Sequence, residues 1–378
     1  MPFSSLGLSP ALLNALTEQN FTAPTPIQET AIPAILSKKD VLGIAETGSG
    51  KTASYVLPLL MNLEQKLMVK NRQADILVLV PTRELAQQVK EVFQIFARAL
   101  SVKIKTLAVF GGVSINPQMM AMQGVNVLVA TPGRLLELVS SNAVDLSSIE
   151  TLVLDEADKL LNLGFKEELN KIISLLPQER QNILLSATLS DDLKNVEQVL
   201  LHDPVVIKVE AEEASLDLIN QIAYIVSDEK KGPFLRYLIK HHEMKQVLIF
   251  ASSVSTADAI VNKLRKNNFD AKVTHSKKSQ GARMDTLHEF KSGKLRILVS
   301  TDLMARGIDI NDLPFVINYE LPRSPKDYIH RIGRTGRAGN SGDAISLVSE
   351  NELHHFEVIQ KKMGKQVPLI DGAGITFV

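Results

Sequence analysis

Short runs of apolar residues alternate with amphipathic stretches along most of this chain of 378 residues. Each run is bounded by polar or turn-forming residues, a pattern typical of strands that are buried on both faces. In the first half of the chain the pattern predicts strands at 41–44, 76–80, 104–110, 127–130, 151–154, 183–186 and 205–209.

Amphipathic segments between these strands predict helices. In 84–100, for example, Leu85, Val89 and Phe93 recur at helical spacing, so this segment should form a helix with one buried face. A shorter helix is expected at 29–36. Strands that alternate with such helices indicate an α/β fold, in which helices cover a parallel sheet.

An acidic, weakly apolar run at 210–217 interrupts the alternation, and we interpret it as a linker between domains at 1–209 and 218–378. Two domains also fit the length of the chain. Beyond the linker, further strands are predicted at 222–226, 247–250, 271–274, 297–300, 316–319 and 344–348. The second domain should therefore repeat the architecture of the first.

Composition restricts the binding partners and the cellular location that we expect for this chain. The 42 basic and 42 acidic residues balance, so any binding of nucleic acid must depend on local patches. No apolar stretch approaches the roughly 18 residues of a spanning helix, and the first residues do not resemble an export signal, so neither membrane insertion nor export is expected. The chain has no cysteine, which fits a reducing compartment, and we expect a cytoplasmic location.

A glycine-rich run follows the first predicted strand and precedes a helical segment. It reads Ala45-Glu46-Thr47-Gly48-Ser49-Gly50-Lys51-Thr52. Backbone N–H groups of such a loop cradle phosphates, the lysine reaches the β and γ phosphates, and the hydroxyl of the last residue can ligate Mg²⁺. The alternative is a turn that merely caps a helix, but the preceding strand and the Gly-Lys-Thr ending favour a nucleotide site.

Carboxylates follow the predicted strand at 151–154, in the segment Asp155-Glu156-Ala157-Asp158. In open α/β sheets ligands bind at the carboxyl ends of strands, which would place this segment beside the phosphate loop. An aspartate there can hold Mg²⁺, and a neighbouring glutamate can activate the attacking water. Taken alone, the segment could equally be an acidic helix start.

Other strand ends carry polar motifs that are ambiguous when taken singly. Ser186 and Thr188 could cap a helix, and the segments around Arg83 and Arg134 could be helix starts or could bind the phosphates of a nucleic acid. The same holds for Gly111-Gly112, which permits either a turn or a close backbone approach. Near the N-terminus, Phe21 and Gln28 could cover and pair with an adenine, or could belong to a proline-rich turn.

The densest cationic cluster lies in the second half, at His330-Arg331-Ile332-Gly333-Arg334-Thr335-Gly336-Arg337. Arginines supplied by a second domain can stabilise the charge of phosphoryl transfer, although a solvated helix end is the alternative. Upstream, Thr301 ends a predicted strand, and Gln280 and Arg283 open a helix beside two lysines.

Taken in order, these motifs resemble the DEAD-box RNA helicases, in particular bacterial ones of the RhlE type, from Phe3 to about Val348. The resemblance implies two tandem RecA-like domains, ATP and Mg²⁺ as cofactors, and RNA as the partner. Ser276 and Lys277 depart from the usual Gly and Asp, which leaves the RNA geometry near Gln280 less defined.

The resemblance also assigns roles. It implies that Phe21 and Gln28 recognise adenine, that Asp155 faces Mg²⁺, that Glu156 is the catalytic base, and that Arg334 and Arg337 are arginine fingers. A ribose contact is implied for Asp309 and nucleotide binding for Gly307. Coupling of hydrolysis to strand separation is implied for Asp158, Ser186 and Thr188, through contacts that include His330. The residues implied to line the RNA track are Arg83, Gly112, Thr131, Arg134, Ser253, Gln280, Arg283 and Thr301.

We therefore expect an RNA-dependent ATPase that closes two domains on ATP and RNA and locally unwinds short duplexes. Contacts to the RNA backbone imply little sequence preference. An ATP-gated RNA clamp or assembly scaffold would use the same residues, and a DNA translocase is disfavoured only by the resemblance. We expect a monomer, with ribonucleoprotein or RNA-decay factors as possible partners.

Overall fold

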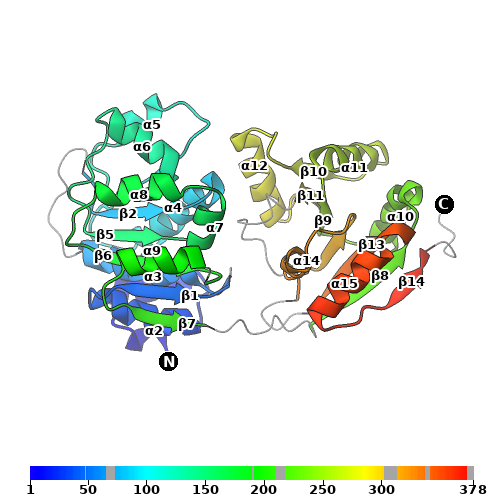
Figure 1. Ribbon diagram of the computed structural model, residues 1–378, viewed down its shortest axis with the longest axis horizontal. Helices are drawn as coiled ribbons and strands as arrows, with labels where there is room; N and C mark the ends of the chain where they lie inside the picture. Colours follow the sequence, from blue (N-terminus) through cyan, green and yellow to red (C-terminus); the bar gives the residue numbers. More distant parts are fainter. Residues whose placement is uncertain are drawn as a thin grey trace. The chain divides into compact units, whose positions relative to one another are not determined.

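The computed structural model describes residues 1–46, 48–64, 73–189, 191–209, 218–301, 313–336 and 341–372. The chain divides into two compact units, Met1–Ala211 and Glu212–Val378, each built around its own sheet (Figure 1). The predicted linker at 210–217 lies outside the described residues.

The sheet of the first unit has seven parallel strands in the order β3-β4-β2-β5-β6-β1-β7. These strands are β1 (Val41–Ile44), β2 (Ile76–Leu79), β3 (Thr106–Val109), β4 (Val127–Ala130), β5 (Thr151–Leu154), β6 (Gln181–Ser186) and β7 (Val205–Lys208). Every predicted strand of this half is present. The central strands are buried on both faces, which explains why their sequences are continuously apolar.

Helices cover both faces of this sheet (Figure 1). The ones packed in one core cluster are α1 (Pro10–Glu18), α2 (Pro26–Leu36), α3 (Lys51–Glu64) and α4 (Arg83–Ala97). The opposite cluster contains α6 (Pro132–Ser140), α7 (Ala157–Asn162), α8 (Lys166–Ser174) and α9 (Asp191–Leu200). Two short elements complete the unit, the 3-10 helix η1 (Phe3–Ser5) and α5 (Asn116–Ala121). Adjacent strand residues point to opposite clusters, as Leu77 and Val78 do.

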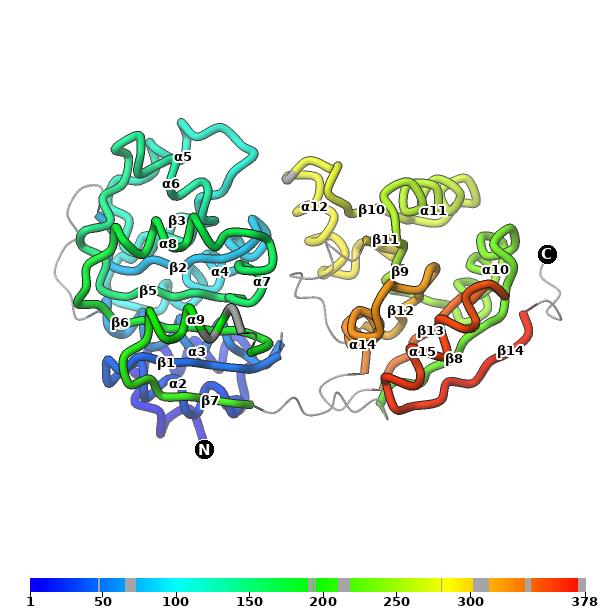
Figure 2. Tube along the Cα trace, viewed as in Figure 1, coloured from blue at the N-terminus to red at the C-terminus, as the bar shows by residue number. Residues whose placement is uncertain are grey.

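The second unit repeats this architecture with strand order β10-β11-β9-β12-β13-β8-β14, again parallel throughout. Its strands are β8 (Ile219–Ile225), β9 (Val247–Ala251), β10 (Ala271–Thr274), β11 (Ile297–Thr301), β12 (Phe315–Asn318), β13 (Gly342–Val348) and β14 (Leu369–Asp371). Its helices are α10 (Asp228–His241), α11 (Val254–Lys266), α12 (Gln280–Lys291), α14 (Pro325–Ile332), η2 (Glu350–Glu352) and α15 (Leu353–Met363). Figure 2 traces these elements along the chain.

Some boundaries differ from the sequence-based expectation. Helix α2 begins at Pro26 rather than at residue 29, because Thr25 and Gln28 form a capping box and proline is favourable in the first helical turn. Helix α1 and the exposed strand β14 were not predicted. No helix in the described part of the chain combines the length and the apolar character needed to cross a membrane.

Candidate functional site

Three predicted motifs meet at the carboxyl edge of the first sheet. They follow β1, β5 and β6, which are neighbours in the order β5-β6-β1. The backbone N–H of Ala45 donates to the carbonyl of Ser186 over 3.0 Å, and that of Asp155 donates to the Leu79 carbonyl on the adjoining strand over 3.0 Å. Parallel pairing thus brings the start of the phosphate loop to Ser186, which lies more than a hundred residues further along the chain.

The phosphate loop connects β1 to α3, which begins at Lys51. Gly48 and Gly50 have φ values of 91° and 89°, in the left-handed region that favours glycine. The buried Lys51 side chain curls back and donates from Nζ to the Ala45 carbonyl over 2.6 Å. Burial lowers the pKa of Lys51, and the charge of Asp155 acts in the opposite direction. The ammonium therefore lies at the loop itself, where a bound phosphate would have to replace the carbonyl as its partner.

Gln28 ties the start of α2 to this loop. Its Nε2 donates to the Gly50 carbonyl over 3.1 Å, while its Oε1 accepts from the Thr25 backbone N–H over 3.0 Å. Both ends of the buried amide are thus engaged within the protein. Phe21 is about one third exposed and contacts Phe3 and Phe96 edge-on. The adenine-binding role of Phe21 and Gln28 stays a prediction.

Asp155 is almost completely buried at the end of β5, and its Oδ2 accepts a hydrogen bond from the Tyr55 hydroxyl over 2.9 Å. Burial raises the pKa of Asp155 to about 6, against the opposing charge of Lys51. A cation bound beside this carboxylate would offset that penalty.

Glu156 has a left-handed backbone, with φ 53° and ψ 48°, at the N-cap of α7. Its Oε1 accepts from Lys159 Nζ over 2.6 Å, whereas its Oε2 is buried and has no hydrogen-bond partner among the described residues. Such an orphaned oxygen is costly in a folded core, and a water or ligand at the site would satisfy it. The two oxygens are therefore in different environments.

The residues implied to couple hydrolysis to strand separation make direct contacts within this unit. Thr188 donates from Oγ1 to Asp158 Oδ2 over 2.9 Å, and Ser186 donates from Oγ to the Thr188 carbonyl over 2.8 Å. The contact of Thr188 with Asp158 is the one that the family resemblance implies. The remaining member, His330, lies on α14 of the second unit.

A second group of motifs follows β2, β3 and β4, which are also neighbours in the sheet. Gly112 has φ 74°, and a Cβ there would overlap the Arg83 guanidinium. Arg134 is buried, donates from Nη2 to the Val113 carbonyl over 2.8 Å, and pairs from Nε with Glu137 over 2.7 Å. Thr131, also buried, directly precedes α6. The loop after β3 is thus held against the ends of the neighbouring strands.

In the second unit, Ser253 caps α11 by accepting from the Thr256 N–H over 3.0 Å. Arg283, Thr301 and Arg334 are each less than one tenth exposed. Gln280 opens α12, but its side chain lies outside the described residues. So do four other predicted site residues, which are Thr47, Gly307, Asp309 and Arg337.

Near Gln280 the predicted basic patch is partly neutralised. The nearly buried His275 contacts Asp258 through Nε2 over 3.1 Å, and Lys278 pairs with the same carboxylate over 3.3 Å. Of the two neighbouring lysines, Lys277 is exposed and Lys278 is partly exposed.

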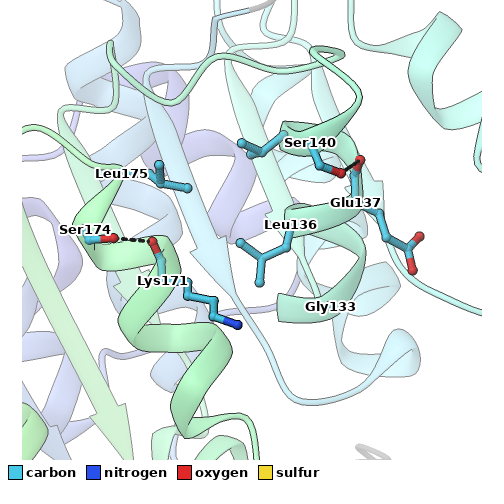
Figure 3. A pocket seen from close by; sticks show the side chains of 8 residues that line it. Gly133, Leu136, Glu137, Ser140, Lys171, Ser174 and Leu175 are labelled. Carbon is cyan, nitrogen blue, oxygen red and sulfur yellow. Dashed lines mark hydrogen bonds between the residues drawn. The ribbon is translucent and has the colours of Figure 1, made fainter.

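A hollow of about 580 Å³ lies between α6 and α8 (Figure 3). Leu136 and Leu175 face it, together with Lys171 and Glu137 at its border. None of the described residues of the phosphate loop or of the segment 155–158 lines this hollow.

Sequence reasoning missed Tyr55 and Lys159. Tyr55 lies one helical turn beyond Lys51, in a stretch that is otherwise apolar. A buried phenol needs a hydrogen-bond partner, and that requirement was the only available signal.

The residues fit Mg²⁺. The Thr52 hydroxyl and the Asp155 carboxylate are oxygen ligands, the type that Mg²⁺ prefers when it also binds nucleotide phosphates. The buried carboxylate with its raised pKa gives an independent reason for a cation to bind there.

Comparisons with known proteins agree with this geometry. The family model for DEAD/DEAH box helicase matches residues 25–196, and that for the helicase conserved C-terminal domain matches residues 230–339. The chain is 38% identical over 376 residues to the DEAD-box ATP-dependent RNA helicase CshA of Streptococcus pneumoniae, covering 99% of this chain and 71% of that protein. It is 39% identical over 368 residues to the ATP-dependent rRNA helicase RRP3 of Meyerozyma guilliermondii, covering 97% of this chain and 76% of that protein.

Solved structures of DEAD-box proteins are also similar to this chain. A DEAD box protein from Methanococcus jannaschii is 35% identical, with coverage of 98% and 99% of the two chains and a TM-score of 0.56. Dbp5 of S. cerevisiae bound to RNA and ADP BeF3 is 29% identical, with coverage of 98% and 95% and a TM-score of 0.82. The fold of each unit is RecA-like, as the motifs implied, whereas the RhlE subtype stays a prediction. The chain belongs to the DEAD-box family of ATP-dependent RNA helicases.

Proposed function

We propose that this protein is an RNA-dependent ATPase that uses ATP and Mg²⁺ to separate or remodel short RNA duplexes. The observation that carries the proposal is the meeting of the phosphate loop, the Asp155-Glu156 carboxylates and the Ser186–Thr188 segment at one sheet edge. Such an edge is where nucleotides bind in parallel α/β sheets.

Each group has a chemical task in this proposal. The loop N–H groups and Lys51 bind the phosphates, and Glu156 Oε2 accepts a proton from the attacking water. When bound through Thr52 and Asp155, Mg²⁺ would supply positive charge to the phosphates. Arg334 and Arg337 would stabilise the charge of the transferred phosphoryl group, which requires that the two units close on ATP.

In this proposal, contacts within the first unit couple ATP hydrolysis to RNA binding. The contact between Thr188 and Asp158 links the segment after β6 to the carboxylates after β5. The candidate RNA residues Arg83, Gly112 and Thr131 follow neighbouring strands of the same sheet. Backbone N–H groups, hydroxyls and guanidiniums contact phosphate and ribose, so we expect little dependence on RNA sequence. We also propose that the protein acts as a monomer in the cytoplasm, on its own or with ribonucleoprotein or RNA-decay factors.

The test is the ATPase rate with single-stranded RNA and with DNA of equal length and sequence. We expect RNA to stimulate turnover and DNA to have little effect. Equal stimulation by both would contradict RNA specificity and would favour a DNA translocase.

A second assay separates unwinding from clamping. Displacement of a labelled strand from a short RNA duplex should require ATP and should fail with Glu156→Gln. If ATP instead prolongs retention on single-stranded RNA without displacing a strand, the protein is an RNA clamp.

A further inference from the structure

We propose that Tyr55 is a positioning residue for Mg²⁺: its hydroxyl fixes the Asp155 carboxylate and thereby sets the Mg²⁺ affinity of the nucleotide site. The inference rests on the proposed ATP–Mg²⁺ site and adds a residue to it. Neither the phosphate-loop motif nor the segment 155–158 contains Tyr55.

The contact is direct and fully enclosed. Tyr55 has no exposed surface, and its hydroxyl donates to Asp155 Oδ2 over 2.9 Å. Its ring lies 6.3 Å from that of Phe93, centroid to centroid, and belongs to the core between α3 and α4. Because the ring is packed and the helix is rigid, the hydroxyl has one position, and it holds one oxygen of the carboxylate there.

The same phenol is linked to both predicted Mg²⁺ ligands. Its hydroxyl donates to Asp155, and it also makes a side-chain hydrogen bond with Thr52. Since Thr52 lies on the same helix one turn earlier, one side chain connects the hydroxyl ligand and the carboxylate ligand.

A purely structural role of Tyr55 would predict that loss of its hydroxyl has no effect on Mg²⁺ binding. A buried tyrosine needs a partner for its hydroxyl, and any acceptor in the core would satisfy it. The chain offers such a case in Tyr328, also fully buried, whose hydroxyl lies 3.2 Å from Ser346 Oγ. The hydroxyl of Tyr55 instead donates to Asp155, the carboxylate that is expected to bind the metal. Removal of the Tyr55 hydroxyl should thus alter Mg²⁺ binding, and removal of the Tyr328 hydroxyl should not.

The test uses the full chain and a fluorescent, non-hydrolysable ATP analogue, with fluorescence anisotropy as the readout. Free Mg²⁺ is titrated at fixed nucleotide, and binding is also measured in EDTA. We expect Tyr55→Phe to raise the Mg²⁺ concentration at half-maximal binding by about tenfold, the lower end of the range for residues that support a metal ligand. Affinity in EDTA should stay within twofold of wild type, because the phosphate loop is unchanged.

Two further variants complete the experiment. Tyr328→Phe should keep the wild-type Mg²⁺ dependence, and Tyr55→Phe added to Asp155→Asn should produce no further shift, because both changes act through one carboxylate. Wild-type Mg²⁺ dependence in Tyr55→Phe would overturn the inference. So would an equal loss of affinity with and without Mg²⁺, which indicates a damaged pocket. If wild type itself binds the analogue equally with and without Mg²⁺, the proposed metal site fails, and the inference fails with it.

Discussion

The two carboxylate oxygens of Glu156 differ: one is paired with Lys159, and the other is buried with no partner in the part of the chain that the structure describes. We predict that Glu156→Gln preserves the binding of ATP and RNA but lowers turnover by about 10²- to 10⁴-fold, the usual contribution of a general base. The amide oxygen can still accept from Lys159, so the local geometry should survive. Steady-state ATPase rates and nucleotide anisotropy measure the two effects, and an undiminished rate would refute the assigned role.

Lys159 should orient this base. We predict that Lys159→Met lowers kcat for ATP several-fold with little change in KM, because the freed carboxylate can adopt other rotamers. Lys159→Arg, which keeps a donor and the charge, should restore most of the rate. A rise in KM without a change in kcat would place Lys159 in nucleotide binding instead.

Asp155 carries a stability penalty in the metal-free protein. Its folded pKa is about 6, raised from 3.8, so below about pH 4 the group is neutral in both the folded and unfolded states and has no effect. As the pH rises from about 4 to 6 the unfolded chain loses its proton first, and the free energy of unfolding falls by about 3 kcal/mol in all. Asp155→Asn should therefore raise the melting temperature in EDTA clearly at pH 8 and only about half as much at pH 5. Equal or lower stability of the variant at pH 8 would contradict this account.

The strands were the most predictable elements, and their predictability has a physical cause. Parallel strands inside a helix-covered sheet are buried on both faces, so β2, β4 and β5 appear in the sequence as uninterrupted apolar runs. Strand β14 has three residues, all exposed, and no such run identifies it. Helix α2 was predicted to start late because Pro24 and Pro26 were interpreted as part of a turn, although proline is favourable at the first position of a helix.

The site residues that follow directly after strands could be predicted from the sequence. The site residues whose position depends on tertiary contacts could not. The segment after β5 was expected beside the phosphate loop after β1, because ligands bind at the carboxyl ends of strands in such sheets. The contact of the segment after β6 with Asp158 was implied only by the family resemblance. The contact of Tyr55 with Asp155 joins residues a hundred positions apart and depends on how α3 packs on the sheet. Arg134 is a second example of a tertiary contact that was not predicted. It was expected to contact RNA, but in the structure its guanidinium holds the loop after β3.

Gly112 lies in that loop and allows a controlled test of the RNA surface. We predict that Gly112→Ala weakens RNA binding several-fold, because the added methyl group would displace the Arg83 guanidinium. Gly124→Ala is the matched control: it has the same left-handed backbone, with φ 68°, but open space around the site. It should lower stability by about 1 kcal/mol without affecting RNA binding. Fluorescence anisotropy with a labelled RNA measures both, and equal losses would mean that backbone strain alone is responsible.

The proposed catalytic groups are divided between the two units. The phosphate loop, Asp155 and Glu156 belong to the first, whereas His330 and Arg334 belong to the second. Neither unit contains the full set, so hydrolysis should require both, and RNA can control the reaction by favouring their closure. This division gives a physical reason why the ATPase should depend on RNA.

Substitution of Arg334 tests whether hydrolysis requires catalytic groups from both units. We predict that Arg334→Ala lowers RNA-stimulated kcat by about 10³-fold or more, as for other arginine fingers, while the first unit still binds nucleotide with near wild-type affinity. Because Arg334 is mostly buried, Arg334→Lys should be measured beside it to preserve charge and packing; a lysine cannot reproduce the planar fork, so its rate should also be low. The exposed Arg323 of the same unit supplies the control, and Arg323→Ala should leave the rate unchanged. Wild-type turnover in both Arg334 variants would mean that Arg334 is not needed for hydrolysis, and would leave Arg337 as the proposed arginine finger of the second unit.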